Sequence, residues 1–553
     1  NLMLNFHKTW GDFDVAALVG TATESTQRTR DGQWGWEFAV PGTISFTNIL
    51  DQNKFFNQSH SLKRLVGVYG EVRASWKNMI YLTVTGRNDW SSTLPTDNRS
   101  YFYPSVSGSL VFTELLPKND VLTFGKVRGS WAQVGKDASP YSTNTYLWGI
   151  QVVNGEFQGV GNSWTGGSPY LLPEIQTSWE VGAELKFFNG RFGIDYTYYH
   201  SVTGNQIAAP RLCQSTGYIF LTINSGSVKN QGMELMITGT PVDTKDFTWD
   251  LVLNMSGNRG TLGDFVEGVD YFYVTDAQIG GVKAASIPNG GYFLGMTGNY
   301  WLRETEKVQD VDKKTGELKV DKDGNPVMVD KEIEGGRYQI DAATGLYKLQ
   351  GNTTNVVGNR EPKLIGGLTS NFRWKDLSFS FLFDFRFGGD IYNGTQYYLT
   401  SLGQSMRTLE NNRTSVTVEG VDSKTMEPVS ITYKAGESYN VNGSVRSGEY
   451  MIQSYWSNYC SNAYNFIQSV NWLRLRNINL SYDFSNLIKG QDVLKGLVAT
   501  FTANNLFYVT NYVGGMDPEV SMGSGTGGSG SVGIDYCGVP SQRSFSFGLN
   551  LTF

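Results

Sequence analysis

The feature that most constrains the fold of this chain is the alternation of apolar and polar residues over long runs. The final run alternates aromatic or leucine side chains with serine, glycine, asparagine and threonine, at Phe545, Phe547, Leu549, Leu551 and Phe553. A period of two gives a β-strand one apolar face and one polar face. Strands of soluble proteins average about five or six residues. Several runs here reach roughly ten to fourteen residues, enough to cross a bilayer at the usual tilt. The pattern favours a transmembrane β-barrel.

Composition agrees with a barrel and excludes other classes. Aromatic residues make up 14% of the chain and charged residues only 17%, against about a quarter in typical soluble domains. The sequence has no run of about eighteen apolar residues, which excludes a transmembrane helix. A net charge of −6 gives no reason to expect nucleic acid. We therefore expect an all-β, antiparallel membrane protein.

The spacing of the runs supports short turns at one end of the strands and long loops at the other. The longest links span about 259–361 and 391–470, whereas their neighbours are turns of a few residues. Such asymmetry is typical of outer-membrane barrels and rare in soluble domains. We predict about fifteen strands, near residues 1–7, 12–20, 65–76, 78–87, 101–114, 122–134, 176–188, 191–202, 229–239, 245–258, 362–374, 377–390, 471–484, 494–507 and 541–553.

The odd number of predicted strands leads to a further expectation. Bacterial single-chain barrels have an even number of strands, and an open sheet edge in a bilayer leaves backbone groups without hydrogen bonds. We therefore expect residues 1–553 to be the C-terminal portion of one barrel domain. Further strands would come from a separate or cleaved segment of the same gene product.

Particular segments resemble the SusC/RagA family of TonB-dependent transporters. They occur in family order from about residue 65 to the end, and no single one is decisive. They are RNDWSS at 87–92, YPSVS at 103–107, KVRGSWAQVG at 126–135, PE and SWEVG within 173–182, NQGME at 230–234, FRFGGDIYN at 385–393 and WLRLRN at 472–477.

The resemblance implies a 22-stranded barrel, with this chain supplying about fifteen strands and with the plug domain and N-terminal strands absent from it. It further implies the bacterial outer membrane, active import of a large glycan or oligopeptide, a SusD-like surface lipoprotein as a lid, and the TonB complex as energy source. Two alternatives stay open. One is a siderophore or cobalamin receptor, and the other is a passive porin or adhesive surface barrel; an upstream plug would distinguish import from a porin.

Catalytic, metal and cofactor sites are not expected. Only three histidines occur, His7, His60 and His200, and none pairs with a nucleophile as a hydrolase would need. Asp321, Asp323, Asn325 and Glu332 match part of a calcium-loop pattern, but Pro326 stands where that loop needs glycine. We favour an Asp-Gly turn in a hairpin across 318–329. The cysteines Cys213, Cys460 and Cys537 lack metal spacing, and whether two form a disulfide stays open.

Two sets of side chains are the candidate functional residues. The alternation directs one set toward the barrel lumen, where plug docking or strand pairing is favoured over substrate contact: Arg87, Glu180, Glu184, Lys186, Arg373, Asp384 and Arg386. Aromatic residues in or near long loops form the second set, because their faces stack on sugar rings or peptide side chains. An interfacial aromatic girdle or loop packing is the alternative for Trp90, Tyr101, Tyr103, Trp164, Tyr170, Trp301, Tyr397, Tyr398 and Trp456.

Overall fold

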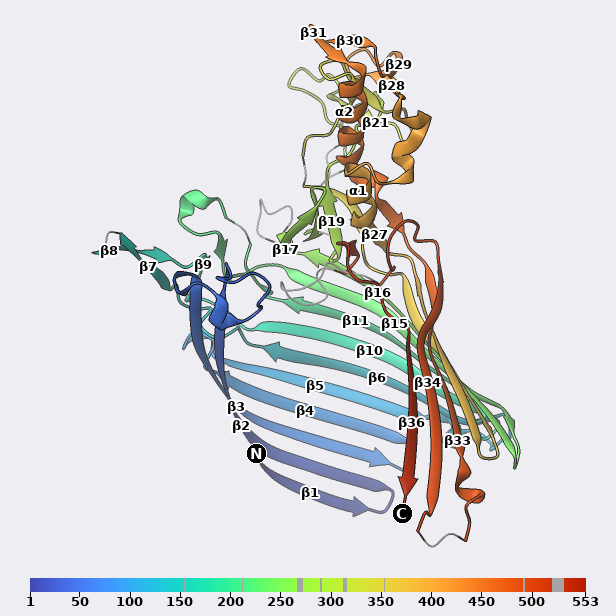
Figure 1. Ribbon diagram of the computed structural model, residues 1–553. Helices are drawn as coiled ribbons and strands as arrows, with labels where there is room; N and C mark the ends of the chain where they lie inside the picture. The colour runs from blue at the N-terminus through green and yellow to red at the C-terminus, as the bar shows by residue number, and fades with distance from the viewer. Residues whose placement is uncertain are drawn as a thin grey trace. The chain divides into compact units, whose positions relative to one another are not determined.

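The computed structural model describes residues 1–153, 156–210, 212–265, 272–288, 291–311, 316–352, 354–490, 493–519 and 532–553. Fifteen long strands form one sheet in the order β1-β2-β3-β4-β5-β6-β10-β11-β15-β16-β25-β26-β33-β34-β36 (Figure 1). Among the described residues, no helix is long and apolar enough to cross a bilayer. The fold class predicted from the alternation is confirmed.

The fifteen strands correspond one to one with the predicted runs. Their bounds are β1 Leu2–Trp10, β2 Phe13–Gly35, β3 Lys54–Trp76, β4 Ile80–Ser91, β5 Ser100–Val111, β6 Leu122–Lys136, β10 Glu174–Phe187, β11 Phe192–Gly204, β15 Ser227–Asp243, β16 Phe247–Gly263, β25 Leu364–Trp374, β26 Leu377–Phe387, β33 Trp472–Asp483, β34 Gly496–Thr510 and β36 Ser544–Thr552. Two of them, β2 and β3, are much longer than predicted.

Tight turns connect alternate strands, as predicted. Lys77 and Asn78 adopt φ of 53° and 54° between β3 and β4, and Asn189 and Gly190 adopt 58° and 84° between β10 and β11. Positive φ at consecutive turn residues gives the backbone twist that antiparallel neighbours need. The alternate links are long, including 137–173, 205–226, 388–471 and 511–543. In an antiparallel sheet these long links leave from the opposite ends of the strands.

The chain divides into two compact units. The first comprises Asn1–Pro241 with Thr261–Val269, and the second comprises Val242–Gly260 with Asp270–Phe553. The first unit holds β1 to β15 of the long strands and small sheets in its loops. These loop strands are β7 Leu147–Val153 with β8 Glu156–Asn162, β9 Thr165–Gly166 with β13 Phe220–Leu221, and β12 Ile207–Ala208 with β14 Ile223–Asn224.

In the second unit, the two longest links, together with β35 from the link between β34 and β36, fold into an ordered body that the alternation did not predict. Its strands are β17 Phe272–Ile279, β18 Val282–Ser286, β19 Gly295–Gly298, β20 Thr305–Gln309, β21 Met328–Glu332, β22 Gln339–Asp341, β23 Leu346–Tyr347, β24 Asn355–Asn359, β27 Asp390–Asn393, β28 Ser415–Asp422, β29 Pro428–Lys434, β30 Ser438–Val441, β31 Ser444–Ser447, β32 Ile467–Ser469 and β35 Ile534–Asp535. Two helices, α1 Gly394–Ser401 and α2 Gly448–Cys460, lie among them (Figure 1). We call this part the loop body.

The loop body has hydrophobic cores of its own. One cluster surrounds Tyr392 and Phe466, and the other surrounds Val418 and Met451; all four side chains are at most 1% exposed. Ser447 caps the N-terminus of α2, and its hydroxyl accepts a hydrogen bond from the amide of Tyr450 at 3.2 Å. Such a cap satisfies an amide that the first turn would leave unpaired. The loops are therefore held by buried packing.

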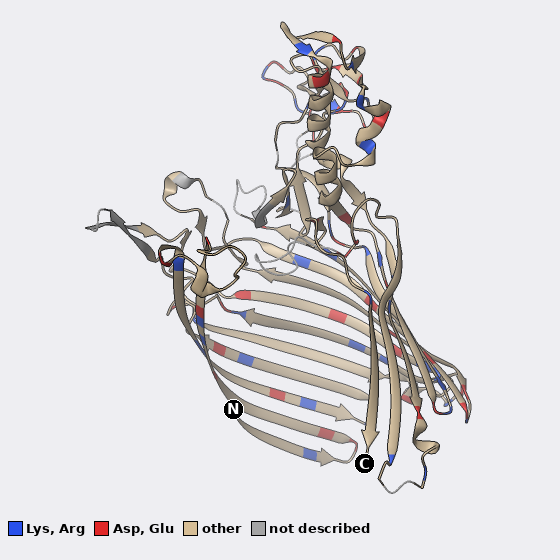
Figure 2. Cartoon of the chain, viewed as in Figure 1, with Lys and Arg blue, Asp and Glu red and all other residues tan. Residues whose placement is uncertain are grey.

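The long strands have two chemically different faces. On one face of the second unit, aromatic rings of neighbouring strands meet in series, with centroids 5.5–6.2 Å apart from Phe372 through Phe381 and Phe383 to Phe507. On β36, Phe547 and Leu549 are 83% and 73% exposed. Apolar groups left in contact with solvent over whole strands are expected on a lipid-facing surface. Figure 2 shows the charges of the strands spaced singly among long uncharged stretches.

Candidate functional site

The charged residues predicted to share the lumenal face do share one face within each unit. Cross-strand register places Arg87 opposite Tyr69 and Tyr103. The same register places Glu180 opposite Ser130, and Glu184 opposite Lys126 and Asp195. In the second unit Arg373, Asp384 and Arg386 lie at alternate positions on neighbouring strands, with Arg373 opposite Ser378 and Thr248. The polar face is opposite the aromatic one.

Ion pairs and hydrogen bonds tie the polar face of the first unit together. The Arg87 guanidinium donates to the Asp89 carboxylate at 2.8 Å, and the Tyr103 hydroxyl donates to the same carboxylate. Tyr101 stacks on Tyr103 with ring centroids 6.0 Å apart. Lys186 pairs with Glu184 at 3.0 Å. The Tyr103–Asp89 bond joins β5 to β4 and supports their register, whereas the Arg87–Asp89 and Lys186–Glu184 pairs each lie within one strand.

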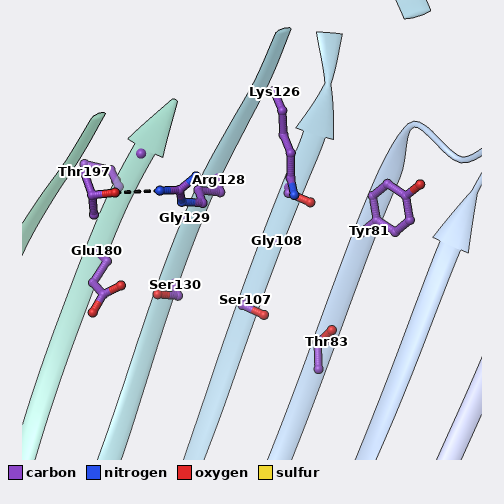
Figure 3. Close-up of a pocket in the computed structure, with 13 residues that line it drawn as sticks. Tyr81, Thr83, Ser107, Gly108, Lys126, Arg128, Gly129, Ser130, Glu180 and Thr197 are labelled. Atoms are coloured by element: carbon purple, nitrogen blue, oxygen red, sulfur yellow. Dashed lines mark hydrogen bonds between the residues drawn. The ribbon is translucent and has the colours of Figure 1, made fainter. Parts of the chain in front are cut away.

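A shallow pocket of about 230 Å³ lies on this polar face, across β4, β5, β6, β10 and β11 (Figure 3). Arg128 donates to both oxygens of Asp195 at 3.1 and 2.6 Å and to the Thr197 hydroxyl at 2.6 Å. Lys126 and Glu180 line the same pocket. Its hydroxyl, ammonium and carboxylate groups suit a polar surface, either of a protein segment or of a passing solute.

The polar face of the second unit carries a denser network. Arg476 donates to Asp384 at 2.6 Å and to both oxygens of Glu519 at 3.1 and 2.8 Å. Arg386 is 7% exposed and donates to the carbonyl oxygens of Gly388 and Arg360, each at 3.1 Å. The Arg386 side chain thus holds the backbone at the end of β26. The sequence alternation predicts only which face Arg386 is on, and it does not predict this burial.

The loop body gathers several of the predicted aromatic residues. Trp301 is 6% exposed, and its ring centroid lies 4.2 Å from Tyr347, 5.1 Å from Tyr338 and 5.8 Å from Tyr459. Trp456 belongs to the same group, because its ring centroid lies 5.4 Å from that of Tyr459. Tyr397 and Tyr398 are 5.4 Å apart on α1, and Tyr397 reaches the same group through Phe466. Aromatic pairs at such distances stabilise a fold by more than their buried area alone accounts for.

Two open cavities adjoin this aromatic group. One, of about 550 Å³, is lined by Tyr300, Trp301, Arg303, Glu332, Tyr338 and Tyr464. The Arg303 guanidinium lies 4.5 Å over the Tyr338 ring, and burial raises the pKa of the Tyr464 hydroxyl. The other, of about 420 Å³, is lined by Tyr397, Arg413 and Trp456 among others. Rings with a few polar groups in cavities of this size are typical of ligand sites.

The remaining predicted aromatic residues are not brought into this group. Trp90 is part of β4 and lies opposite Val66, on the face away from Arg87. Trp164 and Tyr170 lie in the link between β6 and β10, where they are 64% and 81% exposed. Tyr101, only 7% exposed, packs with Leu171 and others at the ends of the strands. These four residues therefore do not form one site with the aromatic group of the loop body.

Sequence reasoning missed several residues that form the aromatic group. Tyr338, Tyr347 and Tyr459 contribute rings to it. Tyr455 and Tyr459 are four residues apart, as on one face of a helix, and that spacing within 448–460 could have indicated α2. Tyr347 lies in β23, and Tyr338 directly precedes β22. No local sequence pattern predicts their position.

The hairpin proposed instead of a calcium loop is confirmed. An antiparallel bridge joins Val320 to Pro326, and the Val327 amide donates to the carbonyl oxygen of Lys319 at 3.0 Å. The Asp321 carboxylate accepts the amides of Asp323 and Asn325 at 2.9 and 2.8 Å, which holds the turn. Glu332 lies in β21, opposite Thr305. No group of three or more potential metal ligands occurs among the described residues. All three cysteines are free thiols.

Comparison with known proteins agrees with this architecture. The family model described as TonB dependent receptor-like, β-barrel, matches residues 2–356. TonB-dependent receptor P26 of Formosa agariphila is 26% identical, over 98% of this chain and 51% of the relative. TonB-dependent receptor SusC of Bacteroides thetaiotaomicron is 27% identical, over 100% of this chain and 50% of the relative.

Among solved structures, the RagAB peptide transporter matches in fold with a TM-score of 0.69. Sequence identity is 18%, and the match covers 100% of this chain and 55% of that one. The chain thus spans about half the length of the curated relatives that it matches. The family match, the fifteen-stranded amphipathic sheet and the asymmetry of its links agree. The chain belongs to the TonB-dependent receptor family of outer-membrane β-barrels.

Proposed function

We propose that this chain forms part of the barrel of an active importer for a large nutrient, a glycan or an oligopeptide. The observation that carries the proposal is the loop body, which holds aromatic rings and two cavities of about 550 and 420 Å³ in a packed framework. Preorganised rings bind a ligand at a lower entropic cost than mobile loops do. The chain contributes binding groups and a conduit wall, and no covalent chemistry.

The two faces of the sheet have separate roles in this proposal. The aromatic face contacts lipid. The polar face, with Arg87, Glu180, Glu184 and Lys186 in the first unit, contacts a plug domain contained in the remainder of the full-length protein. Ion pairs such as Lys186–Glu184 leave further hydrogen-bonding atoms available to a polar partner. The TonB complex acts on the plug, and a SusD-like lipoprotein covers the loop body.

The experiment that tests the proposal measures uptake by cells that produce the full-length protein. Labelled hexasaccharides and decapeptides are supplied with and without a protonophore. Import that stops with the protonophore and with deletion of TonB supports the proposal. Uptake that follows the concentration gradient and ignores the protonophore would identify a passive channel, and energised uptake of ferric chelates alone would identify a siderophore receptor.

The loop cavities are tested in the same cells by Tyr338→Ala, which removes a ring that lines the larger cavity beside Arg303. The expected result is weaker binding of the imported ligand at an unchanged amount of folded protein. Tyr439→Phe is the control, because Tyr439 lies in β30 and lines neither cavity. Equal uptake by both variants would show that the larger cavity does not bind the ligand.

A further inference from the structure

The hairpin formed by β2 and β3 extends well past the strands beside it. Both strands are 23 residues long and pair from Phe13–Trp76 to Gly35–Lys54. The next strand, β4, pairs with β3 only as far as Leu65. The hairpin therefore continues as a two-stranded ribbon over residues 22–35 and 54–64. Its side chains from 23 to 34 and from 55 to 60 are exposed.

Three aromatic rings lie together near the tip of this ribbon. Phe55 is directly opposite Trp34 in the register, and its ring is stacked on that indole with centroids 4.7 Å apart and planes at 19°. Phe55 is also stacked on Trp36, at 4.9 Å and 26°. The exposed fractions of Trp34 and Trp36 are 53% and 51%. We call these three residues the ring platform.

The backbone around the ring platform is well held. An Ala side chain at Gly35, between the two tryptophans, would place its Cβ 2.4 Å from the Asn53 carbonyl oxygen. The Asn53 amide donates to Glu37 at 2.9 Å, and the Asn48 amide donates to the carbonyl oxygens of Val40 and Thr43 at 2.8 and 2.7 Å. The rings thus have a fixed position in the absence of a ligand, which lowers the cost of binding one.

The ring platform is too far from the lipid-facing surface to be part of an aromatic girdle. On the outward face of β3 the continuous apolar series ends at Val66, and the positions beyond it are Arg64, Leu62, His60, Gln58 and Phe56. From residue 66 to residue 55 the strand extends roughly 35 Å, at about 3.3 Å per residue. Girdle residues lie at the membrane–water interface itself. Phe55 also shares the face of β3 that carries Tyr69, opposite Arg87, and not the face that carries Val66, so the rings do not continue the lipid-facing surface.

The surroundings of the rings favour a carbohydrate over a protein. On the same face of the ribbon the register places Gly32 opposite Asn57, and Arg30 opposite Ser59. A Cβ at Gly32 would meet only one atom within 4 Å, which leaves the backbone there open. Three ring faces on a two-stranded ribbon, whose backbones are roughly 5 Å apart, match a few stacked sugar rings, whereas a stable protein interface buries ~800 Å² on each partner.

We propose that the ring platform of Trp34, Trp36 and Phe55 binds a linear oligosaccharide at the outer surface. The apolar face of a sugar ring stacks on the indoles, and the hydroxyl groups take hydrogen bonds from Asn57, Ser59 and Arg30. The inference rests on the import function proposed above and deepens it, since it assigns a glycan to the outer surface. The hairpin then holds a glycan chain before it reaches the barrel.

The test uses the full-length protein in detergent with linear hexasaccharides of four linkage types and with a decapeptide mixture. The double variant Trp34→Ala/Trp36→Ala is expected to weaken binding of the bound hexasaccharide about tenfold, as the loss of two stacked aromatic contacts implies. Phe56→Ala is the matched control: Phe56 is 76% exposed and lies opposite Gln33, on the other face of the same ribbon. This control should bind within twofold of the parent.

The outcomes separate the two proposals. Unchanged affinity in the double variant, binding of decapeptides alone, or no binding of any hexasaccharide by the parent would overturn the ring platform. Loss of a co-purifying lipoprotein with unchanged glycan affinity would also overturn it and would identify a protein-docking surface. Platform-dependent binding without protonophore-sensitive uptake would refute the import function and leave the ring platform standing. Gel mobility before and after heating checks that each variant is folded.

Discussion

Arg474 on β33 and Asp517 in the link after β34 form an ion pair at 2.5 Å whose side chains are 1% and 2% exposed. The Asp517 carboxylate also accepts the amide of Ser541 at 3.2 Å, and the Arg474 guanidinium reaches Glu519 at 2.8 Å. The pair therefore fastens the link between β34 and β36 to the polar face of β33. Burial makes this contact sensitive to the loss of either partner.

Removing Asp517 should destabilise the protein strongly. Asp517→Leu leaves the buried Arg474 with Glu519 as its remaining carboxylate, and breaking a buried pair costs about 3–5 kcal/mol. The free energy of unfolding, measured by urea titration of the full-length protein in lipid vesicles, checks this expectation. Asp330→Ala is the control, because its pair with Lys307 is 57% and 66% exposed. Equal stability of the two variants would contradict the role of the buried pair.

The apolar face of β26 should not tolerate a charge. Phe381→Arg places a guanidinium among the rings of Phe372, Phe379 and Phe383, and such a charge on the lipid face costs about 2–4 kcal/mol near the bilayer midplane. The folded fraction in phospholipid vesicles is the measurement. Ser380→Arg, one residue away on the polar face, should fold nearly as well as the parent. If both variants fold equally, the assignment of the two faces is wrong.

The three thiols should differ in their reactivity with maleimide. A hydrogen bond from Ser215 lowers the pKa of the exposed Cys213, whereas burial raises the pKa of Cys460 to about 11. Because the thiolate is the reacting form, Cys213 should be labelled first at pH 8. The labelling of Cys460 should rise with pH up to about 11. Mass spectrometry of the labelled peptides checks the order, and fast labelling of Cys460 at pH 8 would contradict its burial.

The turn at Asp321 should depend on its carboxylate and should not depend on calcium. Asp321→Ala removes the acceptor for the amides of Asp323 and Asn325, so hydrogen exchange at these two amides is expected to become faster. Asp330→Ala in β21 is the neighbouring control, and its turn amides should exchange as in the parent. Slower exchange on addition of calcium would instead indicate a metal-binding loop.

The long strands were predictable from sequence, because a strand with lipid on one face and water on the other must alternate. The fifteen predicted runs and the short turns between them correspond to the observed strands. The ribbon of β2 and β3 was missed for the same reason. Both faces of the ribbon are exposed over most of its length. Apolar and polar residues therefore do not alternate there, and the sequence shows no period of two.

The residues of the candidate sites divide in the same way. The sequence by itself determined that Arg87, Glu184 and Asp384 are on the polar face, because alternation specifies a face for every strand position. Only the tertiary structure decided that Trp301 meets Tyr338 and Tyr459, and that Phe55 stacks on Trp34. The first two contacts join separate segments of the loop body, and the third joins the two strands of one hairpin. Their positions depend on loop closure and buried packing, which have no local period.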